Sequence, residues 1–408
     1  MKIRLKRNNS GLKGAATLES SKSESNRALI INALAGGSMD NINNLSNARD
    51  TQTMRSLLQE KPEIYDVKDA GTTMRFLTAF LAVHGDGETI TGTDRMKNRP
   101  IGPLVDALRT LGAEIEYLEK DGYPPLKIRR IEKQLTNKIV IPGNISSQYI
   151  SALLMIAPCL EQGLEITLTS EIYSRPYIEM TLSLMKAFGV DNEWNGNTIK
   201  VSSQTYQPTE YTIEGDWSGA SYLYSFLSLA PEGSEIALPT LRKDSTQGDI
   251  AIASIMNDLG IDTRFESDGV HLRKKPLNQK KLSIDFRGCP DLAQTVMVSA
   301  AVLGVELEMT GLESLKIKET DRIAAMQNEL SKIGATLTEN ENTWHLLPTN
   351  QLPDSVMIET YEDHRMAMAF APLSMKMNVT IEDPSVVEKS YPGYWSEVKQ
   401  LSIEIEEA

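Results

Sequence analysis

The segment RPIGPLVDALRTLGAEIEYL, residues 99–118, contains the two patterns that decide the fold. Its first part places apolar residues at the i, i+3, i+4 and i+7 spacing of a helix with one buried face. Gly112 follows the last helical turn, where glycine readily adopts the left-handed conformation that closes a helix. The residues after Gly112 alternate between apolar and polar, which predicts a short strand. The segment therefore predicts a helix, a glycine cap and a strand in direct succession.

The same succession recurs in RPYIEMTLSLMKAFGVDNEW (175–194), QGDIAIASIMNDLGIDTRF (247–265) and DRIAAMQNELSKIGATLTEN (321–340). The closing glycines are spaced by 77, 71 and 74 residues, which indicates an internal repeat. Less exact copies are expected around DTQTMRSLLQ (50–59) and PGYWSEVKQL (392–401). Six such units would fill the chain. A repeated helix and strand predicts an α/β architecture.

Length and composition limit the class of protein. A chain of 408 residues exceeds what one hydrophobic core usually organises, so two domains are expected. No apolar run is long enough to span a membrane, and no apolar segment follows the basic N-terminal residues as in a secretory signal. The two cysteines form neither a disulfide framework nor a metal-ligand spacing, and Cys159 is expected in the core. We therefore expect a cytoplasmic protein with no bound metal.

The net charge of −13, from 55 acidic and 42 basic residues, argues against a nucleic-acid or anionic-membrane partner. In an acidic protein, a cluster of lysines and arginines is more informative than usual. The first cluster lies in LESSKSESNRALIINALAGG, residues 18–37. Ser21 or Ser23 can cap the helix that follows, and a helix N-terminus attracts phosphate or carboxylate groups. A simple helix cap and an anion site are both compatible with this segment.

Four further segments place cations at helix starts or turns: DAGTTMRFL (69–77), TDRMKNRPIG (93–102), LKIKETDRIAAM (315–326) and YEDHRMAMAFA (361–371). Each segment alone could be a solvated turn or a structural ion pair. Glu319 has cations on both sides and could transfer a proton, because nearby charges tune the pKa of a carboxyl group. Together the candidate anion-binding residues are Lys22, Arg27, Arg75, Arg99, Lys318, Arg322, Arg365 and Lys389. Such a set predicts a site for a small, densely anionic ligand.

The order of eleven short segments resembles the EPSP synthase family of enolpyruvyl transferases. The segments are SKSESNRAL, DAGTTMR, RMKNRPIG, NISSQYISALLM, SRPYIEMTL, EGDWSGASY, TQGD, CPDLAQT, KIKETDRI, YEDHRMAM and KSYPGYW, and they run from about Lys22 to Trp395. The resemblance implies a two-domain α/β fold with six βαβαββ repeats, three per domain, around an interdomain cleft. The domains would be 18–217 and 1–17 with 218–408. A monomer without cofactors is implied as well.

The implied reaction transfers the enolpyruvyl group of phosphoenolpyruvate to the 5-hydroxyl of shikimate 3-phosphate and releases phosphate, within the shikimate pathway. Both substrates carry a phosphate and a carboxylate, which explains many cations without a metal. For shikimate 3-phosphate, the resemblance implies Lys22, Ser23, Arg27, Ser146, Ser147, Gln148, Ser174, Tyr177, Asp291, Ser314 and Lys318. For phosphoenolpyruvate, it implies Lys22, Gly71, Arg75, Arg99, Gln148, Arg322, Arg365 and Lys389.

The resemblance also implies catalytic roles. Asp291 would accept the proton of the attacking hydroxyl, Glu319 would protonate the methylene carbon, and His364 would lie close by. Lys22 and Lys389 are rival proton carriers. Retention of Gly71 implies that the inhibitor glyphosate competes with phosphoenolpyruvate, because a bulkier residue at this position obstructs glyphosate in the family.

The chain departs from the family pattern at several positions. Glu19 and Ser20 replace a Pro-Gly pair, Asp69 replaces a common Asn, Phe76 a common Pro and Ser314 a common Asn. Two alternative functions use the same scaffold. A transferase acting on UDP-N-acetylglucosamine would commonly have a reactive cysteine in its first third, and a non-catalytic binding protein would have lost the acid pair Asp291 and Glu319. An enzyme that acts on the ends of nucleic acids is disfavoured by the negative net charge.

Overall fold

The computed structural model describes residues 2–408, which divide into two compact units. Unit 1 contains the residues up to Glu19 together with Glu214–Ala408, and unit 2 is Ser20–Ile213. Each unit encloses its own hydrophobic core. Within the described residues, no helix is long and apolar enough to cross a bilayer.

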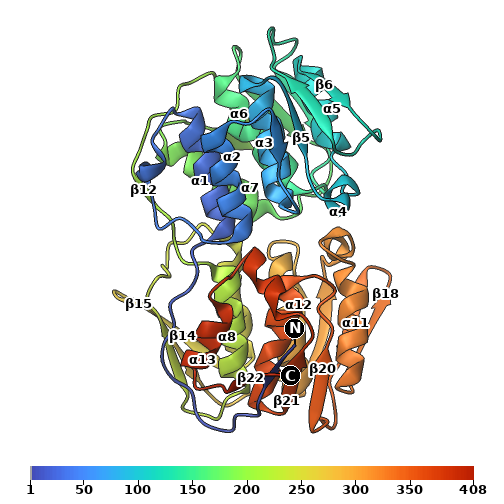
Figure 1. The fold of residues 1–408 in the computed structure, drawn as a ribbon. Coiled ribbons are helices and arrows are strands. Elements are labelled where there is room, and N and C mark those ends of the chain that lie inside the picture. The colour runs from blue at the N-terminus through green and yellow to red at the C-terminus, as the bar shows by residue number, and fades with distance from the viewer. Residues whose placement is uncertain (1) are drawn as a thin grey trace. The chain divides into compact units, whose positions relative to one another are not determined.

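Five sheets of the described residues repeat one pattern, in which a parallel pair of strands is extended by two antiparallel neighbours. Unit 1 holds three of these sheets (Figure 1). In spatial order, the first sheet contains β2 (Lys13–Ala15), β13 (Glu235–Leu238), β15 (Gly269–Lys274) and β14 (Ile261–Glu266). The second contains β16 (Lys281–Asp285), β17 (Glu306–Thr310), β19 (Thr343–Leu347) and β18 (Thr336–Asn340). The third contains β20 (Ser355–Ile358), β21 (Asn378–Ile381), β1 (Ile3–Leu5) and β22 (Ile405–Glu407).

Unit 2 holds the other two sheets and a shorter pair of strands. The sheets are β4 (Ile64–Asp66), β5 (Asp86–Thr91), β7 (Leu126–Arg129) and β6 (Glu114–Tyr117); β8 (Lys138–Ile141), β9 (Leu164–Leu168), β11 (Thr198–Val201) and β10 (Glu193–Asn195). The pair is β3 (Ile42–Asn43) with β12 (Tyr211–Thr212), which run parallel. This sixth copy lacks the antiparallel hairpin, because only residues 61–63 separate helix α2 from β4 and they are too few to form two further strands.

Two helices accompany each copy. In unit 2 they are α1 (Lys22–Leu34) and α2 (Arg49–Glu60), α3 (Gly71–His84) and α5 (Gly102–Leu111), and α6 (Ser147–Ile156) and α7 (Arg175–Ala187), with the short α4 (Asp94–Lys97) between β5 and α5. In unit 1 they are α8 (Trp217–Leu229) and α9 (Ile252–Asp258), α10 (Ala293–Leu303) and α11 (Arg322–Lys332), and α12 (His364–Phe370) and α13 (Tyr394–Gln400). The α/β repeat predicted from the sequence is therefore confirmed.

The glycines predicted to close the repeated helices have positive φ angles, 114° at Gly112, 82° at Gly189, 87° at Gly260 and 80° at Gly334. At Gly112 space is also limiting, since a Cβ atom would lie 2.6 Å from the carbonyl oxygen of Lys133. The strands β6, β10, β14 and β18 follow these glycines, as predicted. Local sequence thus determines where each helix ends and the next strand begins.

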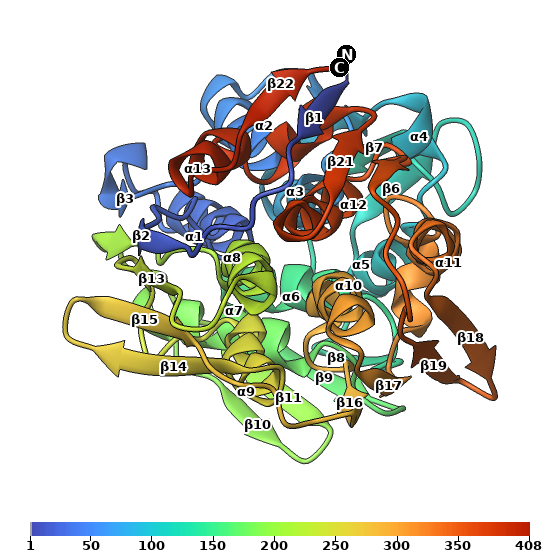
Figure 2. The same cartoon turned by 90° about the horizontal axis from the view of Figure 1, so that it is seen from below.

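The first helix of each copy lies inside its unit. In unit 1, α8, α10 and α12 pack against one another, and Figure 2 shows their ends surrounded by the three sheets. Every residue of α8 and α12 is buried, so the hydroxyl groups on α8 need partners within the core. Ser221 contacts Thr295 at 3.2 Å, and Ser225 accepts a hydrogen bond from Ser299 at 2.8 Å. These contacts fix α8 against α10, and both helices begin beside the polar cluster described next.

Candidate active site

A cluster of charged residues lies at the N-terminal ends of α10, α11 and α12 in unit 1, and its centre is Arg322. This first residue of α11 is almost fully buried, with 2% of its side chain exposed. Its Nε donates to Oδ2 of Asp363 (2.7 Å), its Nη2 to Oε2 of Glu319 (2.8 Å) and its Nη1 to Oδ1 of Asp291 (3.2 Å). Burial would lower the pKa of Arg322, but the three carboxylates raise it. The guanidinium is therefore fixed in position and always charged.

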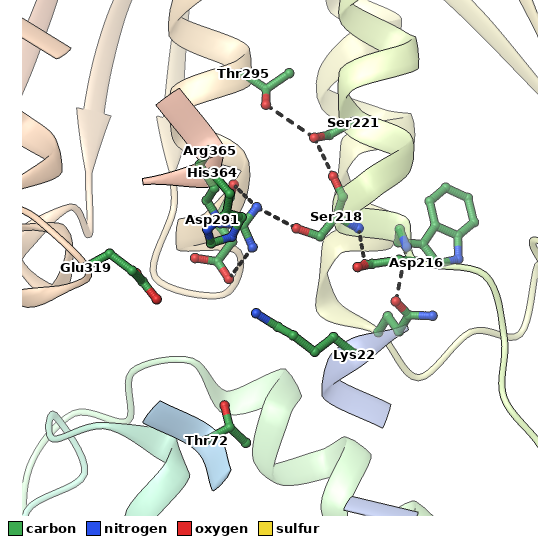
Figure 3. Close-up of polar contacts among 12 residues, drawn as sticks. Lys22, Thr72, Asp216, Ser218, Ser221, Asp291, Thr295, Glu319, His364 and Arg365 are labelled. Atoms are coloured by element: carbon green, nitrogen blue, oxygen red, sulfur yellow. Dashed lines mark hydrogen bonds and ion pairs between the residues drawn. The ribbon is translucent and has the colours of Figure 1, made fainter. Parts of the chain in front are cut away.

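Arg365 holds the second oxygen of Asp291. Its Nη2 donates to Oδ2 of Asp291 at 2.8 Å, while its Nη1 donates to the hydroxyls of Ser218 (2.7 Å) and Tyr222 (3.0 Å), as Figure 3 shows for Asp291 and Ser218. Arg365 reaches this position because Asp363 caps α12 by accepting a hydrogen bond from the Arg365 backbone N–H. Burial raises the pKa of Tyr222 to about 12, so its hydroxyl keeps its proton.

Asp291 lies at the turn that leads into α10, and each of its oxygens faces a guanidinium. Burial would raise the pKa of this carboxyl group, but Arg365, Lys318 and Arg322 together hold it well below its ordinary value. Lys318 lies between η5 (Glu313–Ile317) and α11, and its own pKa is lowered, chiefly by burial. Nearby cations thus keep Asp291 ionised and weaken it as a base.

Glu319 contacts two cations. Arg322 lies 2.8 Å from Oε2 of Glu319, and the Nζ of Lys389 lies 3.7 Å from Oε1. Lys389 is buried and is the last residue of η7 (Pro384–Lys389). The structure therefore brings together the two acidic residues predicted for proton transfer, since Asp291 and Glu319 bind the same guanidinium.

Unit 2 carries a second cluster, at the starts of α1, α3, α6 and α7. Ser21 caps α1 by accepting from the backbone N–H of Glu24, so of the two candidate caps it is Ser21 that acts and not Ser23. Lys22 is the first helical residue, and its Nζ lies 3.5 Å from Oδ2 of the buried Asp50. This helix start thus combines a cap with a full positive charge.

Arg27 lies one turn further along α1 and is almost fully buried. Its guanidinium donates to the hydroxyls of Thr181 (2.7 Å) and Ser151 (3.2 Å) and to the carbonyl of Ser23 (2.8 Å), all of them neutral groups. Its Cζ also lies 5.2 Å from the ring centre of Phe76 and 5.9 Å from that of Tyr177. Burial lowers the pKa of Arg27 to about 10, so it is charged at neutral pH. Within residues 2–408 no carboxylate neutralises it.

Gly71 and Arg99 lie against each other in unit 2. A Cβ atom at Gly71 would lie 2.5 Å from Nη1 of Arg99, so a larger residue here would displace this guanidinium from its present position. Arg75 instead holds the backbone, since its guanidinium donates to the carbonyls of Gly71 (3.0 Å) and Pro100 (2.9 Å). Arg75 therefore joins the two segments that carry Gly71 and Arg99.

The remaining predicted residues of unit 2 lie at two helix starts. Ser146 caps α6, where Ser147 and Gln148 follow, and the Gln148 amide donates to the hydroxyl of Thr72 at 3.1 Å. Ser174 precedes α7 with a φ of 53°, a left-handed conformation that is uncommon for serine. Tyr177 lies one turn into α7, beside Arg27.

Two predicted residues of unit 1 are less closely tied to its cluster. His364 is buried at the start of α12, with its Nδ1 3.6 Å from Oδ1 of Asp363. Ser314 lies in η5, four residues before Lys318. Sequence reasoning missed Asp363, although it stands directly before the two residues that YEDHRMAM drew attention to, and it missed Asp50, which accompanies Lys22.

Three other findings concern predicted features. Neither Glu19 nor Ser20 has a positive φ, so the segment that replaces Pro-Gly does not require glycine. Cys159 is exposed at the end of a 3-10 turn, so its predicted place in the core is wrong. Among the described residues, one group of potential metal ligands, Glu266, Asp268 and His271, lies at the turn end of the β14–β15 hairpin, outside both clusters.

Comparisons with known proteins give one consistent family. A family model described as EPSP synthase (3-phosphoshikimate 1-carboxyvinyltransferase) matches residues 6–61 and 56–398. The 3-phosphoshikimate 1-carboxyvinyltransferase of Bacteroides fragilis (strain YCH46) is 47% identical over 402 residues, covering 97% of both chains. That of Vibrio campbellii is 36% identical over 422 residues, covering 96% of this chain and 97% of the relative.

Solved structures show the same fold at lower identity. The EPSP synthase from Acinetobacter baumannii is 21% identical with a TM-score of 0.80, and the match covers both chains completely. The enolpyruvyl transferase NikO from Streptomyces tendae is 12% identical with a TM-score of 0.71, covering 99% of this chain and 98% of that one.

Proposed function

This chain belongs to the EPSP synthase family, and from that premise we propose how its residues bind the substrates and move the protons. Its activity is that of a 3-phosphoshikimate 1-carboxyvinyltransferase (EC 2.5.1.19), which serves aromatic amino acid biosynthesis. The reaction joins the enolpyruvyl group of phosphoenolpyruvate to the 5-hydroxyl of shikimate 3-phosphate and releases phosphate. The methylene carbon gains a proton and the hydroxyl loses one, so an acid and a base are required.

The observation that carries the proposal is the shared guanidinium of Arg322, which binds both Asp291 and Glu319. Two carboxylates held by one rigid cation can serve opposite proton transfers within a single substrate complex. We assign the base to Asp291 and the acid to Glu319. Lys389, 3.7 Å from Glu319, is the alternative donor on this side. Lys22 in unit 2 is the other alternative.

Substrate binding would strengthen Asp291 as a base. Its low pKa is caused by Arg365, Lys318 and Arg322, which oppose the effect of burial. A phosphate or carboxylate of a substrate that binds Arg322 or Arg365 shares these cations with Asp291. Their hold on the Asp291 carboxylate then weakens, and its affinity for a proton rises. Proton abstraction is thereby favoured when the anionic substrates are bound.

The substrate anions would be recognised by the cations at the helix starts of both units. Arg27 is buried among hydroxyl groups and aromatic rings, and this favours an anion as its missing partner. We assign Arg27, with Lys22, Ser23, Ser146, Ser147, Gln148, Ser174, Tyr177, Ser314 and Lys318, to shikimate 3-phosphate. We assign phosphoenolpyruvate to Arg99, Arg322, Arg365 and Lys389, with Lys22, Gly71, Arg75 and Gln148.

Phosphate release tests the function directly. The chain should release phosphate from phosphoenolpyruvate when shikimate 3-phosphate is supplied, and not when UDP-N-acetylglucosamine replaces it. The opposite substrate preference would refute the assignment. Glyphosate should inhibit in competition with phosphoenolpyruvate, and unaffected turnover at millimolar glyphosate would contradict this.

Two substitutions test the proton roles. Asp291→Asn and Glu319→Gln should each lower kcat by about a hundredfold or more, while the thermal shift caused by shikimate 3-phosphate persists. Asp268→Asn removes an exposed carboxylate from the β14–β15 turn and serves as the matched control with unchanged kcat. Full activity in either test variant would remove that residue from the mechanism.

We further propose that units 1 and 2 are the two domains of the family fold, with three repeats each, and that the active form is a monomer. Support comes from the separate core of each unit and from the presence of every assigned residue in one chain. Light scattering coupled to size exclusion at assay concentrations tests the monomer, and a dimeric mass would refute it.

A further inference from the structure

The turn that leads into α12 has an unusual backbone. Tyr361 and Glu362 both have left-handed φ angles, 53° and 55°, and the backbone N–H of Asp363 donates to the carbonyl of Thr360 at 2.8 Å. Two consecutive positive φ angles with this hydrogen bond are typical of a type I′ turn. Such turns usually contain Asn-Gly, because a residue with a Cβ atom is strained in this conformation, and a bulky aromatic most of all. Contacts elsewhere must therefore hold the turn.

The contacts come from Glu329, a fully buried residue of α11. Its Oε1 accepts the hydroxyl of Tyr361 at 2.8 Å, and its Oε2 accepts the backbone N–H of Glu359 at 3.2 Å. Lys332 completes this arrangement, with its Nζ 2.8 Å from the same carboxylate and 3.3 Å from the carbonyl of Met357. Burial, and then the hydrogen bond to Glu329, raise the pKa of Tyr361 to about 12, so its hydroxyl remains a donor.

The same helix holds the other end of the turn. Arg322 begins α11 and binds Asp363, the last residue of the turn, at 2.7 Å. Glu329 follows Arg322 by seven residues, which corresponds to about 10 Å along the helix axis. The segment from Glu359 to Asp363 is thus attached to α11 at two separated points. Two attachments define both the position and the direction of the segment, which one could not do.

We propose that Glu329 and Tyr361 are positioning residues for the reaction, which act through the strained turn on Asp363. By holding the turn in its left-handed conformation, they place Asp363 against Arg322 and orient the first turn of α12, which carries Arg365. Neither residue belongs to the charged cluster itself. The inference rests on the proposed function, since it concerns how Arg322 and Arg365 are presented to phosphoenolpyruvate.

Tyr361→Phe tests the proposal with the smallest change, because the ring remains and only the hydroxyl is lost. We expect kcat/KM for phosphoenolpyruvate to fall about tenfold, the loss that accompanies one hydrogen bond to a charged group, while KM for shikimate 3-phosphate stays within about twofold. Glu329→Gln should act in the same direction. Tyr224→Phe, which removes the hydroxyl that contacts Thr263 in the same unit, is the matched control. It should leave kcat/KM for phosphoenolpyruvate and KM for shikimate 3-phosphate unchanged.

A second substitution distinguishes positioning from general stability. Glycine adopts left-handed angles without strain, so Glu362→Gly should let the turn form without its attachment. Added to Tyr361→Phe, it should recover most of the lost kcat/KM. If the role were purely structural, Tyr361→Phe would lower the thermal midpoint without changing kcat/KM for phosphoenolpyruvate. That result, or the absence of recovery in the double variant, would overturn the proposal.

Hydrogen exchange provides a readout that does not depend on turnover. The peptide that includes Asp363 should exchange faster in Tyr361→Phe than in the original chain, and slower again after Glu362→Gly is added. Unchanged exchange in Tyr361→Phe would refute the role of the hydroxyl in holding the turn. If the original chain releases no phosphate, the proposed function fails, whereas an active chain with unaffected variants contradicts only this inference.

Discussion

Asp363→Asn should separate the contribution of one ion pair from the rest of the charged cluster in unit 1. The Asp363 carboxylate is fully buried and accepts from Nε of Arg322 at 2.7 Å and from its Nη2 at 3.4 Å. The same carboxylate caps α12 through the Arg365 backbone N–H. Asparagine has nearly the same shape and caps helices equally well. The substitution therefore removes a negative charge and keeps the helix start.

The size of the effect follows from the partners that remain. Removing one member of a buried ion pair costs about 3–5 kcal/mol when its partner is left uncompensated. Arg322 keeps Glu319 at 2.8 Å and Asp291 at 3.2 Å, so the loss should be nearer to that of one charge-assisted hydrogen bond, about 2–3 kcal/mol. For a unit of this size, that corresponds to a fall in Tm of about 5–10 °C.

Activity should change as well, because the guanidinium is then attracted by Asp291 and Glu319 alone. We expect it to shift toward them and KM for phosphoenolpyruvate to rise about tenfold. Scanning calorimetry and steady-state phosphate release measure the two effects, and Asp268→Asn controls for the loss of any carboxylate. A Tm within about 1 °C of the original together with an unchanged KM would show that Asp363 does not hold Arg322.

Three other predictions address single contacts. Gly71→Ala should displace the Arg99 guanidinium, since the new Cβ lies 2.5 Å from it, and should raise both KM for phosphoenolpyruvate and the inhibitory concentration of glyphosate; an unchanged KM argues that this guanidinium does not bind the substrate. Arg49→Ala should raise the same KM a few-fold by exposing the charge of Asp69, 3.1 Å away, and adding Asp69→Asn should restore it; no restoration would show that the two are uncoupled. Although burial opposes it, neighbouring cations depress the pKa of Asp291, so its stabilising effect is complete above its ordinary value of 3.8 and is lost as pH falls below that value; Asp291→Asn should flatten the decline of Tm between about pH 4 and 2, and an identical decline would refute this.

Much of the fold could be predicted from the sequence, because each repeat is marked by patterns among residues that are close in the sequence. Helical periodicity and the glycines after each helix predicted where helices end and strands begin, and Gly112 with its φ of 114° is an example. The partners of each strand could not be predicted in this way. Strand β2 pairs with β13, although all of unit 2 lies between them in the sequence, and β1 lies between β21 and β22. Such pairings depend on contacts between distant parts of the chain.

For the candidate site, too, local features could be predicted from the sequence and contacts between distant residues could not. The sequence identified the cations at helix starts, since a charge beside a capping residue is a local pattern. It could not identify which charges meet, because Arg322 and Asp363 are 41 residues apart. It also gave no sign that Tyr361 adopts a left-handed angle, since this residue type disfavours it. A conformation that local preference opposes can be found only from the contacts that enforce it.

Two departures from the family pattern become intelligible through such contacts. Asp69 would place a negative charge two residues before Gly71, but Arg49 pairs with it at 3.1 Å. Phe76, which stands where proline is common, lies 5.2 Å from the Arg27 guanidinium. An aromatic face stabilises a buried cation by its quadrupole without cancelling its charge, as a carboxylate would. Arg27 can therefore remain charged within the core of unit 2, as its proposed role in binding shikimate 3-phosphate requires, and Phe76 would support that role without touching the substrate.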